Sequence, residues 1–263
     1  MFYLVHHKNV WHSLVKSAKN CFSIGKYSKI PISAQDYNVY FEGMTAMHIY
    51  KVPQVSYERA RSWQRQRVDL CHAGLVNDAL VLLEHPSTYT CGRATRVEHL
   101  PQSAWLQDRG VRVVEIERGG SITYHGPGQL VGYPIIDLRT RGRDVHRYLR
   151  EVEGILITAL NLMGVEGTRR EGLTGVWVGE EKIAAVGIHV SRWITSHGFA
   201  LNIAPDLDFF RAMRPCGLNG DQVTSLEKVL GQVVERAAVE ASIIKAIKTI
   251  WQVEPTVETM LEL

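Results

Sequence analysis

Two residues, Cys216 and Lys182, have the types and surroundings that nucleophilic catalysis requires. Cys216 stands between a proline and a glycine, which predicts an accessible loop. A thiol with a pKa of about 8.5 is only a few per cent thiolate at neutral pH, so it needs a cationic or basic neighbour. Lys182 opens an apolar stretch at 183–188, and apolar surroundings lower the pKa of a lysine. The pair is consistent with an activated thiol. The alternatives are an inert loop cysteine and a solvated lysine at a strand edge.

Three histidines are further candidates. His125 and His197 could each be the base of a cysteine–histidine pair, although His125 could equally hydrogen-bond the glycine-rich loop that contains it. His85 precedes a proline and is interpreted as a structural hydrogen-bonding residue. No group of His, Cys, Asp or Glu residues has the spacing of metal ligands, so we expect no metal.

The stretch 118–138 has five glycines among polar residues and then runs into apolar, β-branched sequence. Such glycines let the backbone approach a ligand closely and leave N–H groups free to point at it. The stretch lacks the Gly-Lys-Ser/Thr ending of a P-loop, and its Gly126-Pro-Gly128 segment precedes a strand where a dinucleotide-binding motif needs a helix. It is therefore interpreted as a cradle for an acyl or carboxylate-bearing ligand, the alternative being a plain connector.

Helices and strands alternate along the rest of the chain. Apolar runs predict strands at 47–52, 79–84, 111–116 and 130–138, and apolar residues three and four apart predict helices at 56–73, 145–163 and 233–251. Three strands at 175–178, 182–190 and 196–203, joined by short turns, predict an antiparallel meander. The polar segment 84–93 is expected to be a loop. Adjacent strands mixed with helices favour the α+β class.

The composition is that of an ordinary globular protein. The chain has 263 residues, of which 45% are hydrophobic and 22% charged, and its net charge is +3. This charge is too small to indicate nucleic-acid binding, and no apolar run is long enough to span a membrane. The four cysteines are scattered without a Cys-x-x-Cys pair, which favours a reducing compartment.

Residues 1–43 differ from the rest. They contain one acidic residue before position 42, and lysines interleave with serines, as in organelle transit peptides, but arginine is absent. The segment is therefore interpreted as an extension of uncertain status, and residues 44–263 as a single catalytic domain. The expected location is the cytoplasm, with the mitochondrial matrix or a plastid as alternatives if the segment is a transit peptide.

Five ordered blocks carry a resemblance to a known family. They include Glu84-His85-Pro86, Arg118-Gly119-Gly120 with Thr123-Tyr124-His125-Gly126-Pro127-Gly128, Gly175-Val176-Trp177 with Lys182 to Ile188, Ser196-His197-Gly198-Phe199-Ala200, and Pro215-Cys216-Gly217. Together they resemble the lipoyl(octanoyl) transferase family over about residues 79–226. The resemblance implies the fold of biotin and lipoate protein ligases, a mixed β-sheet with surrounding helices.

The resemblance also implies roles for individual residues. The acyl-accepting cysteine corresponds to Cys216 and the lysine that lowers its pKa to Lys182. The substrate-binding residues correspond to Arg118, Gly119, Gly120, Ser121, Ile122, Thr123, Tyr124, His125, Ala185, Val186, Gly187, Gly198, Phe199 and Ala200. No cofactor is implied.

The implied reaction moves an octanoyl group from octanoyl-acyl carrier protein, through a thioester on the cysteine, to a lysine of apo lipoyl domains. The acceptors would be the lipoyl domains of 2-oxoacid dehydrogenase complexes and the glycine cleavage H protein. The alternatives are an ATP-dependent lipoate or biotin protein ligase, which needs no cysteine, and a non-catalytic acyl-binding relative.

Two hypotheses about surfaces accompany this interpretation. Gly119, Gly120 and Gly187 are expected to line an acyl tunnel, because small residues leave room for the chain. The basic residues Arg139, Arg141 and Arg143 could dock the acidic carrier protein or form a solvated face.

Overall fold

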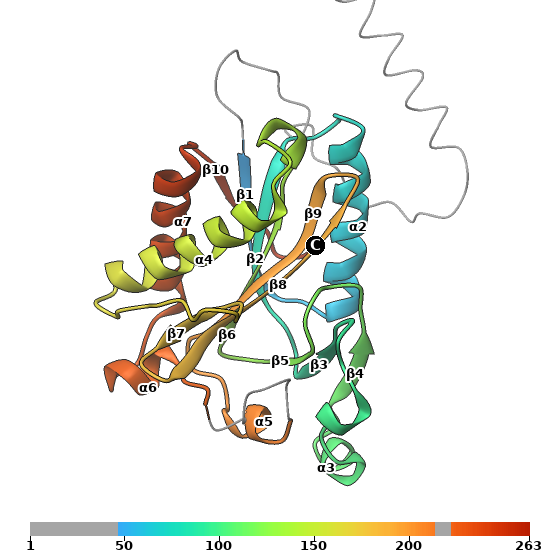
Figure 1. Cartoon of the computed structure of the whole chain (residues 1–263), viewed down its shortest axis with the longest axis vertical. Coiled ribbons are helices and arrows are strands. Elements are labelled where there is room, and N and C mark those ends of the chain that lie inside the picture. Colours follow the sequence, from blue (N-terminus) through green and yellow to red (C-terminus); the bar gives the residue numbers. More distant parts are fainter. Residues whose placement is uncertain (1–46, 214–221) are drawn as a thin grey trace, which may run out of the picture. The chain divides into compact units, whose positions relative to one another are not determined.

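A seven-stranded mixed sheet is at the centre of the structure, a computed structural model that describes residues 47–213 and 222–263 (Figure 1). Its strand order is β10-β1-β2-β6-β9-β8-β7. The β1 strand is parallel to both β10 and β2, and every other neighbouring pair is antiparallel. A second sheet has the order β4-β3-β5, with β3 parallel to β4 and antiparallel to β5.

The bounds of the elements follow the chain. The strands are β1 (Met47–Gln54), β2 (Asp78–Glu84), β3 (Thr88–Cys91), β4 (Arg112–Glu115), β5 (Ile122–His125), β6 (Gln129–Ile135), β7 (Val176–Val178), β8 (Glu181–Ser191), β9 (Ile194–Asn202) and β10 (Thr256–Thr259). The α-helices are α2 (Tyr57–His72), α3 (Ser103–Asp108), α4 (Val145–Leu162), α5 (Asp208–Arg211), α6 (Leu226–Leu230) and α7 (Arg236–Trp251), and the short 3₁₀ helices are η2 (Val97–His99) and η3 (Leu138–Thr140).

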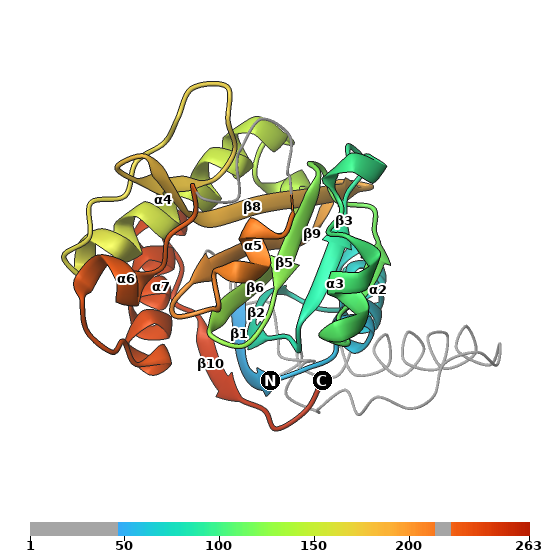
Figure 2. The ribbon, with the colours of Figure 1, turned by 90° about the horizontal axis from the view of Figure 1, so that it is seen from below.

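Helices cover both faces of the large sheet, which explains why its central strands are apolar on both sides. In β2, Leu80 and Leu82 pack toward α4 and α7, whereas Val81 and Leu83 pack toward α2. Figure 2 shows α4 and α7 on one side and α2 on the other, with β3, β5 and α3 on the α2 side. The side chains of Ser56 and Asp144 cap the first turns of α2 and α4.

The α+β class is confirmed, and so are the three long helices and the antiparallel meander. The meander strands are β7, β8 and β9, with Gly187 opposite Gly198 in the β8–β9 ladder. The expected strand at 130–138 is shorter, because β6 ends at Ile135 and Leu138 begins η3.

The small sheet corrects two expectations. The segment 84–93, expected to be a loop, contains β3, and the glycine-rich stretch 118–138 contains β5 between its glycines. Both strands have four residues, so neither shows enough alternation to reveal a strand, and each is completed by pairing with the other. The β10 strand was also not expected, because it is short, largely exposed and paired only at the edge of the sheet with β1.

Residues 1–43 lie outside the described part of the chain, so the interpretation of this segment stays a prediction. Among the described helices, none has both the length and the apolar character to cross a bilayer.

Candidate active site

A cavity of about 280 Å³ lies where the expected substrate-binding residues meet. Strands β8 and β9 and the loop before β5 form much of its wall, and α2 contributes Tyr57. Of the expected residues, Arg118, Gly119, Gly120, Ser121, Ile122, Thr123, His125, Lys182, Ala185, Val186, Gly187, Gly198, Phe199 and Ala200 all line it. Segments more than 60 residues apart in the sequence therefore share one site.

Arg118 holds the glycine-rich loop in place. Its side chain is buried, and one guanidinium nitrogen donates to the carbonyls of Gly119 and Ser121 at 3.0 and 2.7 Å. The other donates to the carbonyl and hydroxyl oxygens of Thr90 in β3 at 2.7 and 2.9 Å. These acceptors are neutral, so the guanidinium brings an uncompensated positive charge to the cavity wall, and burial lowers its pKa.

Gly187 lets this loop lie directly on β8. A Cβ at position 187 would be 3.1 Å from Arg118 Cδ and 3.4 Å from the Gly119 carbonyl oxygen. The Gly119 N–H donates to the Ile188 carbonyl at 3.1 Å, which ties the loop to the same strand. The glycines expected to line a tunnel therefore form a close backbone contact at the cavity wall.

Tyr124 does not line the cavity. Its ring is buried and stacks on Phe209 with 4.5 Å between ring centroids, and its hydroxyl hydrogen-bonds Ser87 at 3.0 Å. Thr123 and His125, its neighbours in β5, line the cavity, whereas Tyr124 does not. Its place in the structure is in the apolar packing beneath the small sheet.

Lys182 stands at the start of β8, with its Nζ 4.9 Å from the centre of the Trp177 ring. Burial lowers the pKa of this amine from its ordinary value to about 8. The carboxylate of Glu153 raises that pKa and the charge of Arg118 lowers it further, but both effects are smaller than that of burial. Close to neutral pH, a larger fraction of Lys182 is therefore neutral and able to accept a proton than of an exposed lysine.

His125 and His197 line the cavity and His85 lies beside His125; all three are buried, which lowers their pKa and leaves them neutral at pH 7. His125 hydrogen-bonds Gln129 at 2.9 Å and Thr90 at 3.3 Å, and burial holds its pKa well below the usual range. His85 contacts the Val55 carbonyl and the Tyr133 hydroxyl at 2.6 and 2.8 Å, which agrees with its expected structural role.

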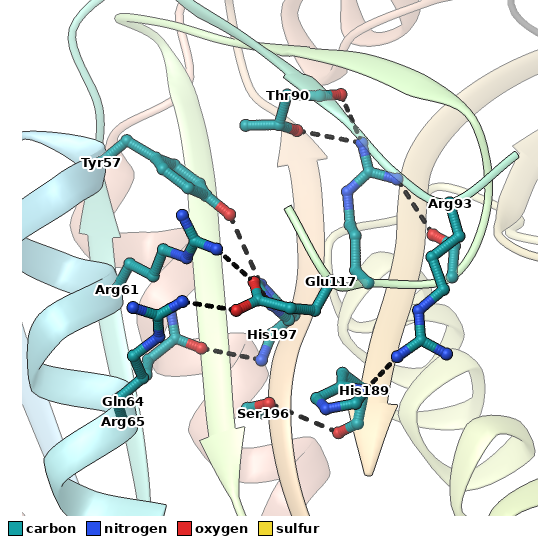
Figure 3. A network of polar contacts seen from close by, with 12 residues as sticks. Tyr57, Arg61, Gln64, Arg65, Thr90, Arg93, Glu117, His189, Ser196 and His197 are labelled. Carbon is teal, nitrogen blue, oxygen red and sulfur yellow. Dashed lines mark hydrogen bonds and ion pairs between the residues drawn. The ribbon is translucent and has the colours of Figure 1, made fainter. Parts of the chain in front are cut away.

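His197 belongs to a polar network that joins α2 to the cavity wall (Figure 3). Its backbone N–H donates to Gln64 at 2.7 Å, and its ring nitrogen contacts the Tyr57 hydroxyl at 3.4 Å. The residue has a left-handed φ of 57°, a conformation that costs free energy outside glycine. Burial lowers the pKa of His197 to about 4, so its 4.0 Å approach to Glu117 is not an ion pair at neutral pH.

Glu117, the residue before Arg118, binds two arginines of helix α2 and so fixes the start of the loop. Its carboxylate accepts from Arg61 at 2.6 Å and from Arg65 at 2.5 Å (Figure 3). Burial alone would raise the pKa of Glu117, but these hydrogen bonds outweigh it and lower the pKa to about 2. The carboxylate therefore stays ionised throughout the neutral range.

The chain is similar to known proteins both in sequence and in fold. Residues 56–248 match the family model described as the lipoyl protein ligase A/B catalytic domain. The octanoyltransferase of Syntrophotalea carbinolica is 46% identical over 198 residues, which cover 75% of this chain and 91% of that protein. The octanoyltransferase of Geobacter metallireducens is 45% identical over 197 residues, 75% of this chain and 90% of that protein. The chain belongs to the lipoyl protein ligase A/B family.

Solved structures of lipoate protein ligases share its fold. A lipoate-protein ligase A with bound ATP superposes with a TM-score of 0.64 at 14% identity, over 84% of this chain and 90% of that one. The bipartite lipoate protein ligase of Thermoplasma acidophilum gives 0.63 at 14% identity, over 82% and 88%. The expected architecture of a lipoate-ligase-like mixed sheet with surrounding helices is therefore confirmed.

Cys216, the other residue expected to react in this family member, lies outside the described residues. The description of the chain stops at Met213 and resumes at residue 222. Met213 and Val223, on either side of this gap, both line the cavity. Val223 also forms a bridge with Lys182, whose N–H donates to the Gln222 carbonyl at 2.8 Å. The chain thus leaves the described structure and returns to it at the cavity that contains Lys182.

The basic run after β6 is engaged within the fold. Arg139 pairs with Asp137 at 2.6 Å, and Arg141 pairs with the buried Asp78 at 3.2 Å. The Arg143 guanidinium lies 6.0 Å from the centre of the Trp193 ring. Arg139 and Arg141 are therefore held by ion pairs within the fold, Arg143 is exposed, and docking of an acidic carrier stays a prediction.

Tyr57 and Glu153 are among the residues near Lys182 or the cavity that were not anticipated from the sequence. Tyr57 lines the cavity from the first turn of α2, and nothing in the sequence distinguishes it from a core residue. Glu153 of α4 is fully buried. The sequence did contain a sign of this, because Glu153 stands among the apolar positions of an amphipathic helix.

Proposed function

We propose that this protein is an acyltransferase that moves an octanoyl group from octanoyl-acyl carrier protein to a lysine of apo lipoyl domains. The observation that carries the proposal is the 46% sequence identity to an octanoyltransferase, over 91% of that protein's length. Three features of this chain support it: the cavity walled by glycines, the partly deprotonated Lys182 beside it, and Cys216 in the short segment between two cavity-lining residues.

In the proposed first step, Lys182 accepts the proton of the Cys216 thiol. The resulting thiolate attacks the thioester carbonyl and the bond to the carrier's sulfur breaks. That sulfur leaves as a thiol after taking the proton that Lys182 had accepted. The lysine ammonium formed in this step favours the thiolate electrostatically. Exchange of one thioester for another is nearly balanced in free energy, so the acyl-enzyme needs no ATP.

In the proposed second step, the neutral amine of the acceptor lysine attacks the Cys216 thioester. A carbon–nitrogen bond forms and the carbon–sulfur bond breaks. Lys182 accepts the proton that the amine loses, and the Cys216 sulfur leaves as the thiolate beside the lysine ammonium. The amide product is more stable than the thioester, which drives the transfer. The 118–121 loop and Gly187 bind the acyl chain and take no part in the bond changes.

The acceptors in this proposal are lipoyl domains of 2-oxoacid dehydrogenase complexes and the glycine cleavage H protein. The setting is a reducing cytoplasm, which the scattered cysteines and the bacterial relatives support.

The test separates transfer from ligation. The purified protein is incubated with an apo lipoyl domain and either octanoyl-acyl carrier protein alone or free octanoate with ATP and Mg²⁺, and the lipoyl domain is weighed by mass spectrometry. We expect an octanoyl adduct with the carrier-bound donor and no ATP. Modification only with octanoate and ATP would establish a ligase, and no modification under either condition would indicate a non-catalytic relative.

A further inference from the structure

Glu153 is a fully buried carboxylate 29 residues before Lys182 in the chain. One of its oxygens accepts from Arg150 at 2.7 Å and from Arg169 at 3.1 Å. The other accepts the backbone N–H of Gly175 at 3.0 Å. A buried carboxylate is costly unless it is paired in this way, and these bonds hold Glu153 in one place.

Gly175 joins this carboxylate to Lys182. Its φ is 135°, and a Cβ at this position would be 2.5 Å from Lys182 Cε and 3.1 Å from Nζ. The backbone at position 175 therefore packs directly against the end of the lysine side chain. The N–H of the same residue donates to Glu153, so Gly175 contacts both the carboxylate and the end of the lysine side chain.

The charges around Lys182 come from three parts of the structure. Glu153 of α4 raises the pKa of the amine, and Arg118 of the cavity loop lowers it. Arg150 and Arg169 partly neutralise Glu153, and Arg170 lies 5.8 Å from the centre of the Trp177 ring that Lys182 also contacts. Glu153 is the opposite charge that counteracts burial at this amine.

We propose that Glu153 is a positioning residue for Lys182, fixing the ammonium group at the cavity through Gly175 and favouring its protonated form through its own charge. The proposal deepens the proposed function and rests on it for the role of Lys182 in catalysis. Glu153 does not contact substrate in this account.

The direct test is a titration that requires no turnover. Lysine labelled with ¹³C at Cε is incorporated, the Lys182 signal is assigned with Lys182→Arg, and its chemical shift is followed from pH 6 to pH 11. In Glu153→Gln, which keeps an oxygen for the Gly175 N–H but loses the charge, the Lys182 midpoint is expected at lower pH than in the wild type. The matched control is Glu151→Gln on the same helix, whose carboxylate pairs with Arg147 and Trp251, and it should leave the midpoint unchanged.

Measurements of the transfer rate provide a second test of the role of Glu153. Glu153→Leu also removes the acceptor for Gly175, and we expect kcat for octanoyl transfer to fall by about tenfold or more with KM within about twofold, whereas Glu153→Gln recovers most of kcat. The Glu153→Gln variant should move the limb of the pH–rate profile due to Lys182 toward lower pH.

A merely structural Glu153 would lower the unfolding temperature without moving either the titration midpoint or the pH profile, and that result would overturn the proposal. If the wild-type protein transfers no octanoyl group at all, the proposed function fails. The titration then still decides whether Glu153 acts on Lys182.

Discussion

The Lys182 amine lies against the Trp177 ring and the Gly175 backbone. Its burial there disfavours the charged form. Its pKa of about 8 means that a substantial fraction is neutral at pH 8, whereas an ordinary lysine reaches that fraction only above pH 10. Arg118 adds a second positive charge at the same cavity. Both effects make Lys182 suited to exchange a proton with a thiol.

The pH dependence of transfer should report this shift. We expect a limb of the kcat/KM profile near pH 8 in the wild type, the value at which Lys182 loses its proton. In Lys182→Arg the guanidinium stays protonated, so this limb should vanish and kcat/KM fall by about 10²-fold or more. Lys228→Arg, at an exposed lysine that pairs with Glu181, is the matched control. Persistence of the limb in Lys182→Arg would assign it to another group.

At the residue scale, the sequence predicted candidates by chemical type, and for Lys182 also its apolar surroundings, but not the individual residues that each candidate contacts. Lys182 was found because a lysine opens an apolar strand, and the structure adds the burial and the neighbours that shift its pKa. Tyr124 stands in the same motif as Thr123 but does not line the cavity, which only the structure reveals. Glu153 contributes through Gly175 across 22 residues of sequence, and such a contact depends on tertiary packing.

At the element scale, the close approach of the 118–121 loop to β8 and the pairing of β8 with β9 build the cavity wall. Gly187 of β8 is opposite Gly198 of β9, and the Gly119 N–H bonds β8 at Ile188. Long elements such as α4 and β8 were predicted because the helical periodicity of one and the apolar run of the other extend over many residues. The short strands β3 and β5 were not, because each owes its conformation to its partner rather than to its own four residues.

A larger residue at position 187 should shorten the acyl chain that the enzyme accepts. The Cβ of Gly187→Val would already be 3.1 Å from Arg118 Cδ, so the branched side chain must displace the loop or occupy the cavity. We expect the ratio of kcat/KM for hexanoyl- over octanoyl-acyl carrier protein to rise by about tenfold, since a methylene in an apolar pocket changes specificity by about 10- to 200-fold. Comparing two donors with one preparation cancels any loss of folded protein. An unchanged ratio would show that Gly187 does not face the acyl chain.

At the scale of the whole molecule, three buried histidines connect the α2 side of the sheet to the cavity. His85 and His197 have their pKa lowered to about 4, and that of His125 is well below its usual value, in each case chiefly by burial. Their neutral rings pack between α2, β6 and β5, with Tyr57 stacked on His125 at 6.0 Å. The fold that assembles the site therefore depends on histidines that stay uncharged.

Stability should consequently fall in mild acid. Below about pH 6.5 the unfolded chain binds protons on these histidines that the folded chain does not, so the free energy of unfolding decreases as the pH falls toward about 4. Each histidine adds a slope of up to about 1.4 kcal/mol per pH unit in that window. Urea unfolding from pH 7.5 to 4.5 measures the slope.

His197→Gln should reduce this slope, whereas His146→Gln, on the exposed face of α4, should leave it unchanged. A slope that is equal in the wild type and in His197→Gln would contradict the account of a buried neutral histidine at that position.

The measurement that tests the central claim most directly is the intact mass of the protein after brief incubation with octanoyl-acyl carrier protein, with no acceptor and no ATP. We predict a mass increase of one octanoyl group that hydroxylamine removes, present in the wild type and absent in Cys216→Ala. A Cys71→Ala control, at a buried thiol whose pKa burial raises to about 12, should still acquire the group. No adduct on the wild type, or an adduct that survives in Cys216→Ala, would contradict a thioester on Cys216 as the intermediate of transfer.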